Sequence, residues 1–302
     1  MRWGDFRRSQ NVEDRTGNAP EGAGGGMPFG GIRLGGGALI ILVIVGMLFG
    51  INPFEMLGMI TGDGSMQAPP QQSAPPSQVP PGYGPQTGAS APSSAAVNKD
   101  FSSAVLGDTE DVWGALFQAM GSRYDPPKLV LYRRLTRTAC GSANAAVGPF
   151  YCPADQDLYL DTSFFNELHT RFGAPGEFAQ AYVIAHEVGH HVQNLLGTMR
   201  QFDAQRQRSD ERTANALSVK LELQADCYAG VWGFYSQKRG IIDAKDIESG
   251  LRAAAAVGDD EITKGGLPPD SFTHGSAEQR ARWFRTGLQS GDPRDCNTFN
   301  AR

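Results

Sequence analysis

The chain has 302 residues, of which 40% are hydrophobic and 20% are charged, and its formal net charge is −5 at pH 7. This balance does not provide the basic surface that nucleic-acid binding requires, so we expect no nucleic-acid partner. The length is sufficient for one globular domain together with further segments of different composition.

The first of these segments is uncharged and apolar. Residues 34–54 contain no charged side chain, and a helix of this length spans about 30 Å, which matches the hydrocarbon core of a bilayer. A cleaved signal peptide would have a short basic start and a small-residue cleavage site. Here 33 residues precede the segment, and Asn52-Pro53 closes it. We therefore predict one N-terminal transmembrane helix over residues 34–58.

The arginines indicate how this helix would be oriented. Five arginines lie in residues 1–33, and no Lys or Arg follows the apolar segment before Lys99. By the positive-inside rule, residues 1–33 form a cytoplasmic tail and the later chain lies in the periplasm or outside the cell. The predicted localisation is the inner (cytoplasmic) membrane, with the lipid bilayer as a partner through the single span.

The composition changes again over residues 59–98. This stretch is rich in Pro, Ser, Gln and Gly and has few charged or large apolar side chains. Such a segment cannot bury enough apolar surface to fold, so we predict a disordered linker. Residues 99–302 are then left as the single folded domain.

Most of this domain has helical periodicity. Helices are predicted at 101–120, 163–172, 177–196, 213–235, 244–257 and 277–288, and strands at 128–132 and 157–161. Few strands and many helices indicate an α+β, mostly helical domain. We expect Leu158–Leu160 to form an edge strand beside the helix at 177–196, where an extended substrate could add to the sheet.

All four cysteines, Cys140, Cys152, Cys227 and Cys296, follow the predicted linker. An even number of cysteines in an exported domain favours disulfides, and four cysteines allow three pairings. Our hypothesis is that Cys140 pairs with Cys152 across a short loop, and that Cys227 holds Cys296 near the C-terminus. The alternative of a structural zinc site lacks a Cys-x-x-Cys spacing.

The sequence His186-Glu187-Val188-Gly189-His190 lies within an apolar helical stretch. Residues four apart share a helix face, so His186 and His190 can bind one metal ion from the same side. This is the H-E-x-x-H pattern of zinc peptidases, in which Glu187 acts as base on a zinc-bound water. Without a metal, the same side chains would be buried without partners, which is energetically costly.

A catalytic zinc site needs a third protein ligand. Glu222 and Asp226 lie four residues apart in the helix predicted at 213–235, and so on one face. We expect Glu222 to bind the zinc ion and Asp226 to accept a hydrogen bond from a ligating imidazole. A Glu four residues before an Asp is by itself common among solvated charges on helices. The H-E-x-x-H segment that precedes this pair favours its interpretation as part of a metal site. No histidine follows His190 at the metzincin spacing.

His274 lies in a turn before the helix at 277–288, which Ser276 caps. A loop histidine at an active site can stabilise the oxyanion of a tetrahedral intermediate. The residues alone favour an ordinary histidine beside a helix cap.

The chain resembles, nearly end to end, the bacterial neutral zinc metallopeptidase family of YpfJ-like proteins. The residues that carry the resemblance are Met1 to Trp3, Asn11 to Arg15, Cys140-Gly141, Gly148 to Pro153, His186 to His190, Glu222 to Cys227, His274 to Ser276 and Arg280. The resemblance implies a membrane-anchored zinc peptidase. The pattern is also similar to gluzincins, in which a Glu four residues before an Asp is the third ligand. This likeness implies an oxyanion-stabilising role for His274, although Gly275 replaces the proline of the gluzincin Thr-His-Pro-Ser stretch.

Together these features predict a membrane-anchored, zinc-dependent endopeptidase with one Zn²⁺ per chain and a peptide or protein substrate. The predicted ligands are His186, His190 and Glu222, and the predicted catalytic residues are Glu187 and His274. One alternative is a zinc-binding envelope scaffold without turnover, against which Glu187 argues because a structural site needs no base. The other is a zinc amidase acting on cell-wall peptides, which the sequence does not separate from a peptidase.

Overall fold

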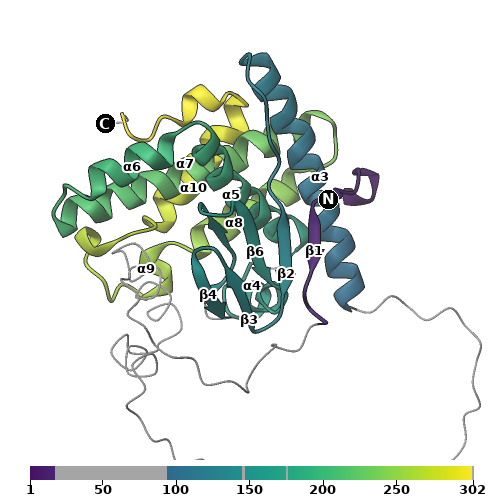
Figure 1. The fold of residues 1–302 in the computed structure, drawn as a ribbon, viewed down its shortest axis with the longest axis horizontal. Coiled ribbons are helices and arrows are strands. Elements are labelled where there is room, and N and C mark those ends of the chain that lie inside the picture. Colours follow the sequence, from purple (N-terminus) through teal and green to yellow (C-terminus); the bar gives the residue numbers. More distant parts are fainter. Residues whose placement is uncertain (18–93, 145–146, 175, 301–302) are drawn as a thin grey trace, which may run out of the picture.

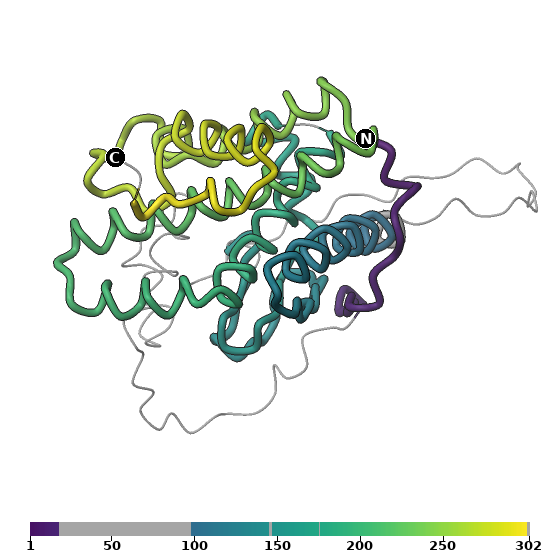
Figure 2. The backbone as a smooth tube through the Cα atoms, turned by 90° about the horizontal axis from the view of Figure 1, so that it is seen from above, coloured from purple at the N-terminus to yellow at the C-terminus, as the bar shows by residue number. Residues whose placement is uncertain are grey.

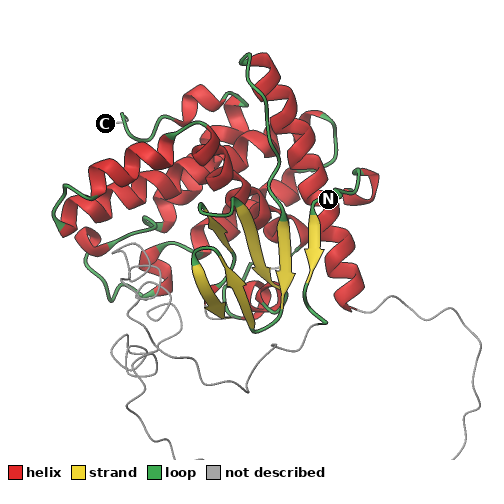
Figure 3. Cartoon of the chain, viewed as in Figure 1, coloured by secondary structure: helices red, strands yellow, loops and turns green. Residues whose placement is uncertain are grey.

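The computed structural model describes residues 1–17, 94–144, 147–174 and 176–300. Helices form most of the described chain, and a small sheet lies to one side of them (Figure 3). The prediction of an α+β, mostly helical domain is therefore confirmed.

The order of the helices and strands along the chain agrees, for the longer elements, with the order predicted from the sequence (Figure 1). The helices are α3 (Ser94–Ala119), α4 (Phe164–Thr170), α5 (Glu177–Leu195), α6 (Thr198–Arg206), α7 (Glu211–Lys238), α8 (Ala244–Ala256), α9 (Asp259–Ile262) and α10 (Ala277–Ser290), with the 3-10 turns η1 (Trp3–Asp5), η3 (Pro269–Ser271) and η4 (Pro293–Cys296). The strands are β1 (Val12–Asp14), β2 (Leu129–Tyr132), β3 (Leu135–Thr138), β4 (Gly141–Asn144), β5 (Phe150–Cys152) and β6 (Asp157–Asp161).

The larger sheet has the strand order β1-β2-β6-β5. The first three strands are parallel, and β5 runs antiparallel to β6. The expectation that Leu158–Leu160 forms an edge strand is therefore wrong, because β6 has a neighbour on each side. The edge strands are β1 and β5, and β5, which lies next to β6, has three residues, too few to give a recognisable alternating pattern.

Residues 1–17 pack against the domain (Figure 2). Strand β1 pairs with β2, the ring of Trp3 lies 5.5 Å from that of Phe101, and the guanidinium of Arg8 binds the carboxylate of Asp100. This packing differs from the predicted cytoplasmic tail at 1–33, since its first half is part of the folded body. This packing could not be predicted from the sequence, because β1 has only three residues and its partner strand is more than one hundred residues away.

The membrane part of the predicted fold class is corrected. Among the described residues, no helix combines the length and the apolar composition needed to cross a bilayer. The long helices α3 and α7 carry charged side chains along their length, which a hydrocarbon core excludes. The predicted span at 34–58 lies outside the described residues, as does most of the predicted linker. The last residues of that linker, from Ser94, already belong to α3.

Helix α7 lies between α5 and α10 and packs against both. Its contact with α10 is very close, since a Cβ atom on Gly287 would lie 1.9 Å from the carbonyl oxygen of Cys227. Helix α5 is buried on most sides, with fifteen of its residues in the interior. Two of the buried residues are His186 and His190, so the H-E-x-x-H segment lies in the interior.

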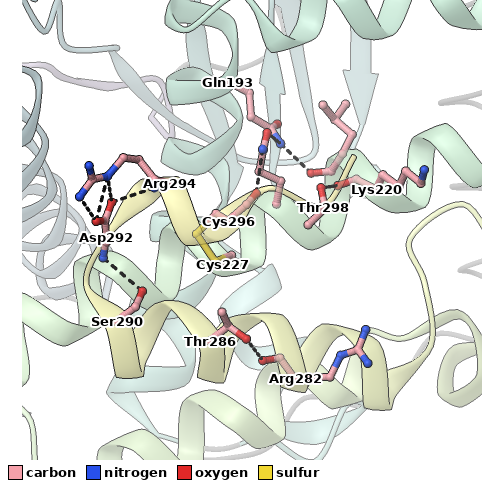
Figure 4. The surroundings of a disulfide bond; sticks show 12 residues. Gln193, Lys220, Cys227, Arg282, Thr286, Ser290, Asp292, Arg294, Cys296 and Thr298 are labelled. Carbon is pink, nitrogen blue, oxygen red and sulfur yellow. Dashed lines mark hydrogen bonds and ion pairs between the residues drawn. A yellow bond between two sulfur atoms is a disulfide. The ribbon is translucent and has the colours of Figure 1, made fainter. Parts of the chain in front are cut away.

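Two disulfides brace this arrangement, and their pairing is the one hypothesised from the sequence. Cys140 is bonded to Cys152, which ties the β3–β4 hairpin to β5. Cys227 is bonded to Cys296, which joins α7 to η4 beside the side chain of Gln193 (Figure 4). The C-terminal segment is therefore attached to the helix that carries Glu222.

Candidate metal centre

Helices α5 and α7 bring the three predicted metal ligands together. Nε2 of His186 lies 3.2 Å from Oε2 of Glu222, and Nε2 of His190 lies 3.5 Å from Oε1 of the same carboxylate. One ligand atom from each of the three residues lies within 4.8 Å of the other two. The two imidazoles come from successive turns of α5, as their spacing predicts.

This donor set fits a zinc ion. In a tetrahedral site with metal–ligand distances of about 2.0–2.1 Å, neighbouring donor atoms are roughly 3.3 Å apart. The separations of 3.2 and 3.5 Å between the imidazole nitrogens and the carboxylate oxygens are close to that value. Two imidazoles and one carboxylate are also a ligand set of catalytic zinc sites, which keep a fourth position for water.

Gly189 allows the two ligand-bearing helices to approach each other. A Cβ atom at this position would lie 2.8 Å from the carbonyl oxygen of Ala225 and 3.0 Å from its Cα atom. Backbone atoms of a helix cannot move aside as a flexible side chain can. A larger residue would therefore push α7 away and carry Glu222 away from the imidazoles.

Asp226 orients one of the candidate ligands, His186, through a hydrogen bond. Its Oδ1 atom lies 2.8 Å from Nδ1 of His186, so Nδ1 carries the proton and Nε2 is left for the metal. This is the contact predicted for Asp226. The hydroxyl of Tyr182 donates to the same oxygen at 2.5 Å.

Arg280 completes this buried group. Its Nε and Nη2 atoms donate to the two carboxylate oxygens of Asp226 at 2.9 and 3.0 Å, and its Nη1 donates to the carbonyl oxygen of Val257 at 3.0 Å. The guanidinium is 4% exposed. It therefore balances the charge of Asp226 in the interior, where an unpaired carboxylate would be very costly.

His190 is oriented by a different set of groups. Its Nδ1 atom lies 2.9 Å from Oε1 of Gln193, and the amide nitrogen of Gln193 donates to the carbonyl oxygen of Leu221 at 2.7 Å. Gln193 thus links the second imidazole to the residue before Glu222. Each ligating imidazole is fixed by a partner from outside the ligand set.

The charges of the centre are strongly coupled. Burial acts to lower the pKa of His186, but Asp226 and Glu222 raise it to about 10. Burial acts to raise the pKa of Glu222, yet His190 and His186 hold it well below its usual value. The carboxylates that attract a proton to these imidazoles also favour a divalent cation between them.

Glu187 lies on the same buried turn as the ligands and lines the adjoining cavity. Burial raises the pKa of its carboxyl above the ordinary value, against the opposing effect of His186 and His190. A raised pKa suits a group that must take up a proton and then release it. Its place agrees with the role of base predicted from the sequence.

His274 lines the same cavity. Its Nδ1 atom lies 3.0 Å from Oδ1 of Asp259, and the other oxygen of Asp259 accepts the backbone N–H groups of Thr273, His274 and Gly275. One buried carboxylate therefore fixes both the loop and the imidazole. Nε2 of His274 remains for a group in the cavity.

His191, the neighbour of the second candidate ligand, has contacts of its own. The ring nitrogens of His191 contact the hydroxyl of Tyr151 at 3.2 Å and the carbonyl oxygen of Asp125 at 2.7 Å. Burial lowers the pKa of this imidazole. His191 joins α5 to β5 and to the loop before β2, away from the candidate metal centre.

Comparison with known proteins agrees with this centre. Residues 1–299 match the family described as "Putative neutral zinc metallopeptidase". The chain belongs to this family. It is 45% identical to the uncharacterized protein YpfJ of Escherichia coli strain K12 over 304 residues, which cover 99% of each chain. It is 46% identical to the uncharacterized protein Rv2575 of Mycobacterium tuberculosis strain H37Rv over 201 residues, 62% of this chain and 67% of that protein. No solved structure gives a significant match.

Three residues of the site were not assigned a role from the sequence. Tyr182 precedes His186 by one helical turn, and Gln193 follows His190 by three residues, so helical spacing could have identified both. Asp259 gives no such signal. Its helix has only four residues, and its contact with His274 depends on how the intervening chain folds back.

Proposed function

We propose that this protein is a zinc-dependent endopeptidase. The proposal is carried by one observation, which is that buried Glu187 lines the same cavity as His186 and His190, whose Nε2 atoms lie 3.2 and 3.5 Å from the Glu222 carboxylate, close to the donor–donor separation of a tetrahedral zinc site. A purely structural zinc site has no use for a buried carboxylate beside its ligands. Membership of a zinc metallopeptidase family supports the same activity.

The roles of the residues follow from their positions. A zinc ion held by His186, His190 and Glu222 would polarise the peptide carbonyl and make water a better nucleophile. Glu187 takes a proton from the attacking water and passes it to the nitrogen of the leaving amine, for which its raised pKa is suited. Nε2 of His274 donates to the oxyanion as it develops.

We also propose that the domain functions in an oxidising compartment. Every cysteine of the chain is in a disulfide, which is typical of exported proteins. Because residues 1–17 pack against the same body, they would share that compartment. This proposal differs from the cytoplasmic tail predicted at 1–33.

The activity is tested on the purified full chain loaded with zinc. We expect about one zinc per chain by elemental analysis, and cleavage of denatured casein by the wild type. Glu187→Gln should keep the zinc and lose activity by about 100-fold or more, within the range of roughly 10²- to 10⁴-fold that a general base contributes. The matched control is Glu248→Gln on the surface of α8, where the side chain is 69% exposed and activity should be unchanged.

Equal activity of Glu187→Gln and the wild type would remove the assigned base. Zinc binding without any cleavage would instead favour the non-catalytic scaffold.

A further inference from the structure

The candidate metal centre faces a cavity of about 440 Å³. This volume lies within the range of roughly 300–1,000 Å³ that is usual for ligand sites. Its walls are mainly large apolar side chains. Those nearest in sequence to the ligand-bearing helices are Phe164, Phe172, Val183, Met199, Phe202 and Leu221.

The apolar side chains that line the cavity come from segments before, within and after helix α5. Val183 is one helical turn before Glu187, and Phe172 precedes α5. Phe202 belongs to α6, which follows α5 directly. A peptide bond placed at the candidate metal centre would therefore have apolar surface beside it.

The wall also carries charged side chains. Arg280 is bound to Asp226, and the guanidinium of Arg206 lies 5.9 Å from the centre of the Phe202 ring. Asp203 and Arg206 are one turn apart on α6 and carry opposite charges. Apolar side chains form the larger part of the wall, so the wall favours an apolar side chain.

The edge strand β5 would set the direction in which a bound peptide runs through the cavity. Among the strands that the structure describes, β5 pairs only with β6, and its other edge, called the open edge below, has no strand partner there. The hydroxyl of Tyr151 on β5 accepts from the side-chain amide of Asn194 on α5 at 3.0 Å and contacts His191. These contacts hold the open edge beside the turn of α5 that carries His190, and Phe150 and Tyr151 line the cavity.

We propose that the cavity binds an extended peptide along β5 and selects a large apolar side chain, aromatic or aliphatic, next to the scissile bond. Backbone hydrogen bonds to the edge strand would hold any sequence, and the apolar wall would select among sequences. The proposal rests on the proposed peptidase function. Its test is therefore a binding measurement that needs no turnover.

The probe is a set of fluorescent, glycine-rich decapeptides that differ only in one central residue, which is Phe, Leu, Ala or Asp. Each is titrated with the zinc-loaded full chain carrying Glu187→Gln, and binding is followed by fluorescence anisotropy. We expect the Phe and Leu peptides to bind at least tenfold more tightly than the Ala peptide, since filling an apolar pocket discriminates by about 10- to 200-fold. Equal affinities, or tighter binding of the Asp peptide, would overturn the proposal.

Variants of the wall show whether this cavity is responsible. Phe172→Ala and Phe202→Ala should each reduce the ratio of Phe to Ala affinity, and Val183→Phe should do so by filling the space. The matched control is Leu196→Ala, because Leu196 is 41% exposed at the end of α5 and does not line the cavity. Zinc content and melting temperature are measured for each variant. An unchanged ratio in all the folded wall variants would contradict the assignment.

Cleavage mapping separates this inference from the proposed function. Wild-type cleavage of denatured casein beside all residue types alike, with none by Glu187→Gln, would overturn the selectivity and leave the peptidase intact. Selective peptide binding without cleavage would support the selectivity and count against the peptidase.

Discussion

Two guanidinium–carboxylate pairs in this protein have nearly the same geometry and very different surroundings. Arg280 donates to both oxygens of Asp226 at 2.9 and 3.0 Å, and Arg8 donates to both oxygens of Asp100 at 2.7 and 2.8 Å. The first pair is almost completely buried, and its Asp226 contacts the candidate ligand His186. The second joins the N-terminal segment to α3, with side chains that are 33% and 47% exposed.

The difference shows what each pair is used for. Water can replace either partner of the exposed pair, so that pair contributes little to the free energy of unfolding. No water replaces a partner of the buried pair, so both charges must stay in place once the domain has folded. The buried pair thereby fixes the position of His186, whereas the N-terminal segment is held by β1 and the aromatic packing of Trp3.

The largest effect is expected when one buried charge is removed. Arg280→Leu leaves the carboxylate of Asp226 unpaired in the interior, and we expect a loss of about 3–5 kcal/mol in the free energy of unfolding. The measurement is denaturant unfolding of the zinc-free protein. A loss below about 1 kcal/mol, typical of an exposed pair, would contradict the comparison.

The second effect concerns the metal. Asp226→Asn keeps the shape but weakens the hold on Nδ1 of His186, and we expect zinc affinity to fall about 10- to 100-fold, measured by competition with a chelator. The matched control is Asp108→Asn, since Asp108 is also buried and binds Trp232 and Arg239, which lie beyond Asp226 toward the C-terminal end of α7. Asp108→Asn should lower stability and leave zinc affinity unchanged. Equal losses of zinc affinity would contradict the assigned role of Asp226.

An intermediate effect is expected for Asp259 and should depend on pH. Burial acts to raise the pKa of Asp259, but His274 and the backbone N–H groups lower it below the ordinary value of 3.8. Its contribution to stability is therefore present above pH 3.8 and is lost as the pH falls below that value toward the folded-state pKa. Asp259→Asn should be less stable than the wild type by roughly 1.5–3 kcal/mol at pH 6.

The difference for Asp259→Asn should shrink below pH 3.8 in thermal melting. The exposed pair of Asp292 and Arg294 provides the control, since Asp292→Asn should change stability little at either pH. A difference that stays constant with pH would show that Asp259 does not act through its charge.

The smallest effect is expected at the N-terminal segment. Arg8→Ala should lower the free energy of unfolding by at most about 1 kcal/mol. The loss should be smaller still in 1 M salt, where charges are screened within roughly 3 Å. Denaturant unfolding at two salt concentrations measures both. A loss above about 2 kcal/mol that persists in salt would remove the distinction between the two pairs.

The ligand set could be predicted because it depends on helical spacing. His186 and His190 are four apart, as are Glu222 and Asp226, and each pair shares a helix face wherever the helices lie. The two longest strands of the sheet, β2 and β6, were also predicted, because each has a run of apolar residues. The sequence does not show how closely α5 and α7 approach, but Gly189 explains it once the contact is known.

What was missed depends on contacts between distant or very short segments. Strand β1 has three residues and needs β2 to become a strand, so residues 1–17 were assigned to a tail. Strand β5 has three residues, so the edge was assigned to β6 instead. Asp259 reaches His274 only because the chain turns back after α9. The residue pattern within a short segment does not show which distant segment it will contact.

Strand β1 has a consequence for the order in which the domain is made. Val12 pairs with Leu129, so β1 has no partner strand until more than one hundred further residues have been synthesised. At roughly 5–20 residues per second, that delay is about 6–23 s. Strands β2 and β6 are close together in the chain and meet first, since short loops close at lower entropic cost. Strand β1 would then be translated before the other strands of its sheet and join them last.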